Sequence, residues 1–347
     1  MFPLDFPAEI LSGASAGQWV LDPFCGRGTT LFAARLAGLP AIGVDVNPVA
    51  AALAAAKLVS VTPTRVIRRC HELLQSGFDP REVPEGDFWT LAFSPTTLLD
   101  ICRLREQLLV AEPSPSIVAL RAVILGVLHG PLRKGLPTYL SNQMPRTYAT
   151  KPASAVRFWR AREMPPPDVD VFDVVRRRAC YVFDTLPDPV EGEARHGDSC
   201  LEVARLRNKF SWVITSPPYY GMRTYLPDQW LRSWFLGGSA NVDYHLAGQL
   251  PQRSEAIFVD GLAGVWRSVS GCCTPGAHLA IRFGALPSMA RDPQALISRS
   301  LAEADAGWVV RQVCPAGSPP RGARQADQMA GAGAYVQEVD IYATLGN

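Results

Sequence analysis

The stretch at residues 20–30 constrains the fold of this chain more than any other part. Its sequence, Val-Leu-Asp-Pro-Phe-Cys-Gly-Arg-Gly-Thr-Thr, predicts an apolar strand, a glycine-rich turn and the start of a helix. The next strand is expected over residues 41–46, where Asp45 stands near the end, and another helix over residues 49–57. This βαβα order is typical of the start of a doubly wound parallel α/β sheet.

Two smaller features surround that start. A short helix is expected at residues 6–11, and the strand at residues 18–21 leads into the glycine-rich turn. Thr29 and Thr30 are suited to cap the following helix, which we expect to end at Gly38.

Regular alternation of strands and helices then stops until about residue 195, a gap too long for a loop in a compact domain. Apolar spacing predicts helices near residues 97–110, 116–129 and 169–183 within this gap. Alternation resumes with strands at residues 194–198 and 212–215. Further on we expect a helix at residues 258–269, a turn at Pro275-Gly276, a strand at 278–283, a helix at 293–304 and closing strands at 308–313 and 335–343.

A second motif, Ser216-Pro217-Pro218-Tyr219, follows the predicted strand at residues 212–215. Proline fixes φ and removes backbone donors, so the chain that leaves the strand presents carbonyl acceptors in a set direction. Such acceptors suit the two hydrogens of an exocyclic amine on a flat base, and Tyr219 can stack on the ring of that base. A rigid turn after an edge strand is the alternative interpretation of the proline pair alone.

Together, Phe24-Cys25-Gly26-Arg27-Gly28 and Ser216-Pro217-Pro218-Tyr219 make the chain similar to the S-adenosylmethionine-dependent amino-methyltransferases of DNA, with their F-x-G-x-G and S-P-P-Y motifs. The resemblance covers the two ends of the chain well and the middle poorly. It implies a class I methyltransferase fold, a Rossmann-like doubly wound α/β sheet with a large, mainly helical insertion after the second strand. Residues 1–57 and 193–347 would then form the catalytic domain that binds S-adenosylmethionine, and residues 58–192 the insertion, a candidate target-recognition region. Residues 2–11 would provide only a shortened form of the family's N-terminal cofactor helix, or else the N-terminus is incomplete.

The resemblance also implies a mechanism. In this family, the residue at the position of Ser216 and the carbonyl that follows it accept the hydrogens of the target amine, which leaves the nitrogen lone pair free to attack the sulfonium methyl. Orientation and hydrogen-bonded charge then perform the catalysis without a covalent intermediate. The implied catalytic residues are Ser216, Pro217, Pro218 and Tyr219. The chain has no Pro-Cys dipeptide, the step that carries the nucleophile of the carbon-5 cytosine enzymes.

The glycine-rich turn supports the same cofactor on chemical grounds. Such a turn lets a cofactor approach the backbone, and the amides at a helix start can bind its carboxylate. Asp45 is placed to accept hydrogen bonds from ribose hydroxyls, and Asp198 could receive an adenine amine. Taken alone, an ordinary tight turn and a solvated strand end explain these residues as well, whereas a nicotinamide cofactor is disfavoured because the third glycine of that fingerprint is missing. The residues expected to bind S-adenosylmethionine are Asp22, Phe24, Gly26, Gly28, Thr29, Asp45, Asn47 and Asp198.

Any surface for nucleic acid must be local, because the formal net charge is only +2. The basic segment, residues 133–162, combines arginines, lysines and aromatic residues with almost no acidic residue before Glu163. It is the candidate contact to duplex DNA whose target base is flipped out of the stack. A solvated basic face over a packed aromatic residue is the alternative, and a loop with Arg321 and Arg324 is a secondary candidate. The expected DNA-binding residues are Arg146, Lys151, Arg157, Trp159 and Arg160.

The remaining composition narrows the class of protein. The 8 cysteines include no C-x-x-C pair, which indicates reduced, mostly buried thiols of a cytoplasmic protein. The longest apolar stretch, residues 117–128, is too short to span a membrane, and the N-terminus lacks the pattern of a signal peptide. His71, His129 and His245 show no ligand spacing, so no metal is predicted, and Trp230 and Trp234 at helical spacing are expected in the core.

The leading hypothesis is therefore a site-specific DNA methyltransferase of a restriction-modification system, for which a nuclease is a candidate partner. Ser216 favours N4 of cytosine as the target, since similar enzymes with Asp or Asn at this position mostly act on N6 of adenine. An N6-adenine DNA methyltransferase, an RNA or protein amide methyltransferase and a non-catalytic nucleic-acid-binding module stay open as alternatives.

Overall fold

The computed structural model of the chain describes residues 2–132, 134–135, 137–207, 209–220, 226–242, 254–285, 291–316 and 337–346. By their internal contacts these residues form two units. The first comprises the described residues within Met1–Leu58, Asp188–Thr224 and Gly248–Asn347. The second comprises those within Val59–Pro187 and Tyr225–Ala247.

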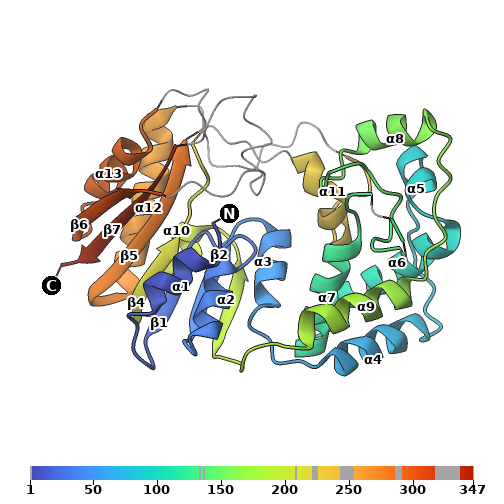
Figure 1. Ribbon diagram of the computed structural model, residues 1–347, viewed down its shortest axis with the longest axis horizontal. Helices are drawn as coiled ribbons and strands as arrows, with labels where there is room; N and C mark the ends of the chain where they lie inside the picture. Colours follow the sequence, from blue (N-terminus) through green and yellow to red (C-terminus); the bar gives the residue numbers. More distant parts are fainter. Residues whose placement is uncertain are drawn as a thin grey trace. The chain divides into compact units, whose positions relative to one another are not determined.

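A seven-stranded mixed sheet forms the centre of the first unit, with strand order β3-β2-β1-β4-β5-β7-β6 (Figure 1). The five strands from β3 to β5 run parallel, and β7 is antiparallel to both of its neighbours. Strands β1, β2 and β4 are buried and mostly apolar, as expected for parallel strands covered on both faces. The strands are β1 (Trp19–Asp22), β2 (Ala41–Asp45), β3 (Gly192–His196), β4 (Phe210–Thr215), β5 (Cys273–Ala285), β6 (Trp308–Pro315) and β7 (Gln337–Leu345).

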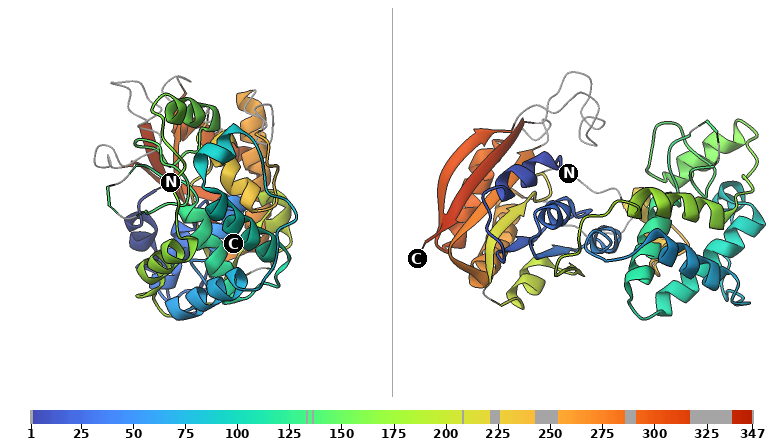
Figure 2. Two further views of the ribbon diagram at one scale, coloured as in Figure 1. Left: turned by 90° about the vertical axis from the view of Figure 1, so that its right-hand side faces the viewer. Right: turned by 60° about the horizontal axis from the view of Figure 1, so that its bottom comes forward.

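Helices cover both faces of this sheet (Figures 1 and 2). On one face a core around Val20, Leu31 and Ile214 lies beneath α1 (Asp5–Leu11), α2 (Thr29–Leu36) and α3 (Pro48–Ala55). On the other face a larger core around Phe258 and Trp266 lies beneath α10 (Ser199–Ala204), α12 (Glu255–Cys272) and α13 (Pro293–Ala304). The predicted architecture is confirmed: a Rossmann-like, doubly wound α/β sheet with helices on both faces.

The strand order places a topological switch point between β1 and β4. The chain runs outward from β1 through β2 to β3, and then returns across β1 to form β4 and β5 on the other side. In open α/β sheets, ligands bind in the crevice outside the carboxyl ends of the strands at such a point. The end of β1 and the end of β4 are therefore the positions at which to look for a site.

Two local predictions in this unit were wrong. Thr29 and Thr30 do not cap α2, because Gly28 is at the N-cap in a left-handed conformation and the Thr30 hydroxyl donates instead to the Ile214 carbonyl at 3.2 Å. Pro275-Gly276 does not separate α12 from the next strand, since β5 begins at Cys273 and runs through both residues. The β4 pairing shifts register at this place, which accommodates Gly276 at φ +76° within the sheet.

The second unit is built from helices (Figure 2). Helices α4, α7 and α9 pack against one another, and the apolar α7 is largely buried. The sequence predicted α6, α7 and α9 but not α4, α5 or α8, which are short or have few buried apolar positions. Trp230 and Trp234 are buried beside Trp89, as predicted. The helices are α4 (Pro63–Leu74), α5 (Asp87–Ala92), α6 (Pro95–Val110), α7 (Pro115–Val127), α8 (Pro152–Arg160), α9 (Val171–Phe183) and α11 (Leu226–Phe235).

Arg35 of α2 fixes the two points where the chain leaves the first unit and returns to it. Its guanidinium donates to the Lys57 carbonyl at 2.9 Å and to the Asp188 carbonyl at 3.1 Å. The side chain is buried, and burial lowers its pKa. One buried side chain thus holds both ends of the long segment that the chain inserts between α3 and β3.

Two general expectations can be checked in the structure. All eight cysteines are free thiols, and they are mostly buried as predicted, although Cys180 is exposed. Within the described residues, no helix has both the length and the apolar character required to cross a membrane.

Candidate active site

Asp22 ends β1 and holds the start of the glycine turn, residues 23–28. The side chain is 1% exposed, and its Oδ1 accepts the Phe24 amide at 3.1 Å. Burial raises the pKa of Asp22 to about 6, although hydrogen bonds from Thr215 and the Phe24 amide act in the opposite direction. Asp22 therefore orders the turn from beneath and is shielded from solvent.

Asp45 ends β2 and holds the middle of the same turn. One carboxylate oxygen accepts the Gly26 amide at 2.8 Å, and the other accepts the Asn47 amide at 2.8 Å. Asn47 in turn caps α3 by accepting the Val49 amide at 2.9 Å. The pKa of Asp45 is raised, because the effect of burial outweighs the two backbone hydrogen bonds, which lower it. Each carboxylate oxygen keeps a further lone pair for a ligand hydroxyl.

The two glycines of the turn have different reasons to be glycine. Gly26 has φ +51°, and a Cβ placed there would meet no atom of the described residues within 4 Å. Gly28 has φ +79°, and a Cβ there would approach Ala54 Cα to 2.9 Å. Gly28 thus permits close packing of the turn on α3, whereas the space beside Gly26 is open to a ligand.

The other residues predicted to bind a cofactor lie around this turn. Thr29 is the first residue of α2 and is half-buried, and the Phe24 ring packs edge-on against Trp266 at 6.4 Å. Asp198 follows β3, is exposed and caps α10 by accepting the Cys200 amide at 2.9 Å. The neighbouring Ser199 hydroxyl donates to the Pro23 carbonyl at 2.5 Å, which ties the end of β3 to the glycine turn.

The Ser-Pro-Pro turn, residues 216–219, begins directly after β4 and is joined to the glycine turn. The Thr215 hydroxyl donates to Asp22 Oδ1 at 2.6 Å, a bond between residues 193 positions apart. Ser216 is half-buried and Pro218 is exposed, while Pro217 is buried. The structure thus brings both sequence motifs to the switch point between β1 and β4.

Tyr219 is held differently from the stacking position that we expected. Its ring is 6% exposed and meets Phe283 edge-on, with centroids 5.9 Å apart. Its hydroxyl donates to Glu338 Oε1 at 2.5 Å. The expectation that this ring lies open to stack on a base is corrected for the structure described here, because the ring belongs to the core beneath α12.

The basic segment divides into buried support and exposed charge. Trp159 is 0% exposed, its Nε1 donates to the Gln143 carbonyl at 3.1 Å and its ring packs beside Phe88. Its prediction as a DNA contact is therefore wrong, because spacing on a basic helix does not reveal which face carries the core. Arg133 lies outside the described residues, as does the loop with Arg321 and Arg324.

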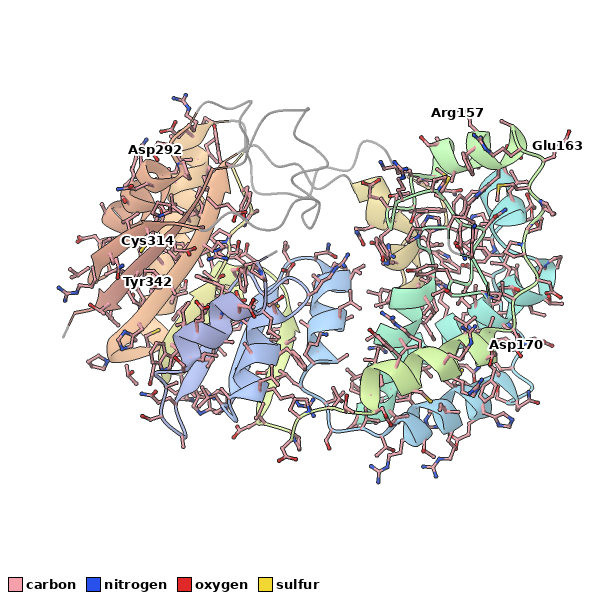
Figure 3. All side chains as sticks on the ribbon, viewed as in Figure 1. Arg157, Glu163, Asp170, Asp292, Cys314 and Tyr342 are labelled. Carbon is pink, nitrogen blue, oxygen red and sulfur yellow. The ribbon has the colours of Figure 1, made fainter. Side chains whose placement is uncertain are left out.

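Four predicted DNA contacts in this segment are exposed: Arg146, Lys151, Arg157 and Arg160. Arg160 pairs with Asp87 at 2.6 Å, and Arg157 lies on the outer side of α8 (Figure 3). Arg146 and Lys151 adopt φ of 57° and 43°, a conformation that non-glycine residues seldom take. The surface is therefore a set of exposed cations, two on α8 and two in the chain before it, and the opposite side of α8 is core.

Sequence reasoning missed three residues that organise the site: Thr215, Ser199 and Glu338. The first two directly follow or precede predicted motif residues, and small hydroxyl residues at strand ends are a usable signal. Glu338 follows a stretch outside the described residues and carries no local pattern. Its contact with Tyr219 spans 119 positions and needs the fold to be seen.

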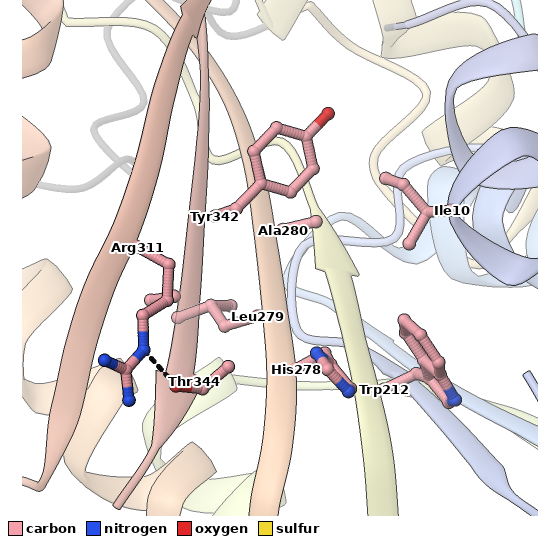
Figure 4. Close-up of a pocket in the computed structure, with 9 residues that line it drawn as sticks. Ile10, Trp212, His278, Leu279, Ala280, Arg311, Tyr342 and Thr344 are labelled. Carbon is pink, nitrogen blue, oxygen red and sulfur yellow. Dashed lines mark hydrogen bonds between the residues drawn. The ribbon is translucent and has the colours of Figure 1, made fainter. Parts of the chain in front are cut away.

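A separate hollow of about 140 Å³ lies on the α1 side of the sheet (Figure 4). Trp212 and His278 stack at 4.4 Å along its wall, and Arg311 donates to Thr344 at 2.8 Å on the opposite side. None of its lining residues belongs to the glycine turn or the Ser-Pro-Pro turn. We therefore do not assign it to the candidate active site.

Part of the chain matches a known family model. Residues 2–56 match a family model described as DNA methylase. The matched segment holds the glycine turn and Asp45 but neither the Ser-Pro-Pro turn nor the second unit. It supports a methyltransferase and leaves the target atom undecided. No curated protein sequence matches the chain.

Solved structures that resemble the chain include methyltransferases, at low similarity. A geranyl diphosphate methyltransferase in complex with GPP and sinefungin has 10% identity over 98% of this chain and 77% of that chain, with a TM-score of 0.37. The rRNA methyltransferase aviRa from Streptomyces viridochromogenes has 15% identity over 99% and 85%, with a TM-score of 0.36. TrmN from Thermus thermophilus has 11% identity over 99% and 48%, with a TM-score of 0.35. At these scores the likeness transfers neither substrate nor cofactor.

Proposed function

We propose that this protein is an S-adenosylmethionine-dependent methyltransferase that acts on an exocyclic amine of a DNA base, with N4 of cytosine as the favoured target. The observation that carries the proposal is the hydrogen bond from Thr215 to Asp22 at 2.6 Å. It fixes the glycine turn and the Ser-Pro-Pro turn side by side at the switch point of the sheet. Methyl transfer requires such a placement of a donor next to an acceptor.

The cofactor half of the proposal rests on the glycine turn. The open space beside Gly26 admits the methionine part of S-adenosylmethionine, and the first amides of α2 suit its carboxylate. The free lone pairs of Asp45 and Asp198 suit the ribose hydroxyls and the adenine amine. The bound cofactor supplies an electrophilic methyl on a sulfonium.

The acceptor half rests on the Ser-Pro-Pro turn. The Ser216 hydroxyl and the Pro217 carbonyl accept the two hydrogens of the base amine, so the amine is oriented for in-line attack without a covalent enzyme intermediate. The amine nitrogen gains the methyl as the sulfur–methyl bond breaks, and it releases one proton to solvent. An aromatic amine is a weak nucleophile because its lone pair is delocalised, so orientation must provide most of the rate. The second unit with its exposed cations is the proposed holder of the DNA backbone.

Binding and transfer can be tested separately. Asp45→Ala is expected to weaken binding of S-adenosylhomocysteine at least about tenfold, measured by calorimetry. Asp292→Ala is a matched control, because Asp292 also accepts a backbone amide, at the start of α13, and lies outside the two turns. Unchanged affinity in Asp45→Ala would remove Asp45 from the cofactor site.

Transfer of a labelled methyl group to duplex DNA, structured RNA and protein, each offered alone, tests the substrate. DNA is the expected acceptor because residues 2–56 match a DNA methylase model. Ser216→Ala is expected to lose at least about a hundredfold in kcat while it keeps cofactor affinity. Transfer to RNA alone would favour the RNA alternative, and binding of DNA without any transfer would favour the non-catalytic one.

A further inference from the structure

A buried polar group lies behind the Ser-Pro-Pro turn, at the start of β7. Tyr219 donates from its hydroxyl to Glu338 Oε1 at 2.5 Å, and the two residues are 6% and 5% exposed. A phenylalanine ring would fill the same space without this bond. The structure therefore keeps a carboxylate in the interior next to the tyrosine of the motif, which is costly unless the group is paired.

Arg282 of β5 provides the compensating charge. Its Nε and Nη2 donate to the two oxygens of Asp340 at 2.7 and 2.6 Å, and the ring of Phe6 covers its guanidinium at 4.0 Å. Burial lowers the pKa of Arg282, but the hydrogen bonds and charge of Asp340, together with the charge of Glu338, outweigh burial and raise it. The guanidinium is therefore hydrogen-bonded to Asp340 and acts on Glu338 only through its charge.

The register of the sheet makes room for this arrangement. Strand β5 extends beyond the end of β4, because the last pair between them joins Ile281 to Thr215. On β7, Glu338 lies opposite Gly284 and Asp340 lies opposite Arg282. Residues opposite each other share a face of the sheet, so Gly284 brings no side chain to the place where the Tyr219 hydroxyl reaches Glu338.

We propose that Glu338 is a positioning residue for methyl transfer, which acts through Tyr219 to set the place of the Ser216 hydroxyl and the Pro217 carbonyl. This inference rests on the proposed function and refines the part that Tyr219 has in it: the tyrosine anchors the turn from within the core and does not stack on the base. Misplacement of reacting groups by about 1 Å can cost a hundredfold in rate, so the anchor has a large effect without touching the substrate.

Three substitutions separate anchoring from stacking. Tyr219→Phe keeps the ring and removes the hydroxyl, Glu338→Ala removes the acceptor, and Glu338→Gln keeps an acceptor without charge. We expect kcat to fall at least about tenfold in Tyr219→Phe and Glu338→Ala, no further in the double variant, and less than about threefold in Glu338→Gln. The affinity for S-adenosylhomocysteine should stay within about twofold in all of them.

Matched controls are Tyr181→Phe, whose ring is 80% exposed, and Glu191→Gln, an exposed acid of the first unit. Full activity of Tyr219→Phe with inactivity of Tyr219→Ala would overturn the inference and return the ring to stacking. Thermal unfolding of the same variants measures the Tyr219–Glu338 hydrogen bond independently of activity. Tm losses that add in the double variant would also overturn the inference. A wild-type chain that methylates no DNA would overturn the proposed function, while non-additive Tm losses would still report the bond.

Discussion

The two turns at the switch point and the basic segment are held in opposite ways. At the switch point, hydrogen bonds of 2.6 to 3.1 Å join Asp22, Asp45 and Thr215 to the two turns. Asp22 and Thr215 are buried, and Asp45 is half-buried. In the basic segment, Lys151 and Arg157 lie in solvent on a helix that is fixed by the buried Trp159. At the switch point the functional groups themselves are held in place. In the basic segment only the buried side of the helix is held, and the charged groups are not.

This difference follows from what each region is proposed to contact. Methyl transfer needs reacting atoms within a narrow range of distance and angle, which only bonded and packed groups can hold. Phosphate contacts need charge more than geometry, and long solvated side chains can follow the backbone of a duplex. The contrast predicts that substitutions in the two regions change different measurable quantities.

The largest effect is expected where the basic segment meets the core. Trp159→Ala should lower the free energy of unfolding by about 3–5 kcal/mol, because the indole is fully buried. Arg157→Ala, two positions earlier on α8, should change it by less than about 0.5 kcal/mol, because this side chain is exposed. Urea unfolding of both variants measures the difference. Equal stability would contradict the assignment of Trp159 to the core and of Arg157 to the surface.

Next in size is the contrast between the two glycines of the turn. Gly28→Ala should cost about 2–4 kcal/mol of stability, since its φ is +79° and the new Cβ would lie 2.9 Å from Ala54 Cα. Gly26→Ala should cost only about 1–2 kcal/mol, from its φ alone, but should weaken binding of S-adenosylhomocysteine. Thermal unfolding and calorimetry together check both. If both variants keep the wild-type affinity, the space beside Gly26 holds no ligand.

Asp22 joins the glycine turn to the Ser-Pro-Pro turn, and Asp22→Asn tests how its ionisation makes the stability depend on pH. Because burial raises the pKa of Asp22 to about 6, the folded chain keeps a proton that the unfolded chain releases between about pH 4 and 6. This residue therefore lowers stability as the pH rises through that window. Asn keeps an acceptor for Thr215 without the charge, so the variant should gain about 2 kcal/mol relative to wild type between pH 4 and pH 7. A difference that is constant with pH would contradict the burial of a titrating Asp22.

The smallest effect is expected from the exposed cations. Replacing Lys151, Arg157 and Arg160 together by alanine should weaken DNA binding about tenfold and flatten the salt dependence by about two units of slope, with cofactor affinity unchanged. Alanine at Arg68, Arg205 and Arg299 is the control, because these arginines are also exposed, carry the same total charge and lie outside the basic segment. An identical salt slope in both triple variants would return the basic segment to a solvated face.

The sequence was most informative where structure is local. The strand, glycine turn and helix at residues 19–36 and the helix at Pro293–Ala304 appear as predicted, because apolar runs and turn residues determine them within a few positions. Helices α4, α5 and α8 were not predicted, although α4 and α8 have local signals: both are amphipathic and begin with proline, and Thr62 caps α4. Helix α5 has only six residues and no side-chain cap.

Contacts between distant residues were beyond such reasoning. No pattern near Thr215 reveals that its hydroxyl meets Asp22, and none near Tyr219 reveals Glu338. Likewise, the position of Trp159 among arginines suggested a contact to nucleic acid, and only the structure shows that it lies on the buried face of α8. The motifs could therefore be predicted, whereas the partners that hold them could not.

One measurement tests the central claim most directly. The full chain is incubated with S-adenosylmethionine that carries a deuterated methyl group and with unmethylated duplex DNA of mixed sequence, and the digested nucleosides are analysed by mass spectrometry. We predict N4-methylcytosine with the deuterated methyl, and its absence in Ser216→Ala. Labelled N6-methyladenine alone would contradict the choice of base, and no labelled nucleoside from a chain that binds the cofactor and the DNA would contradict the account as a whole.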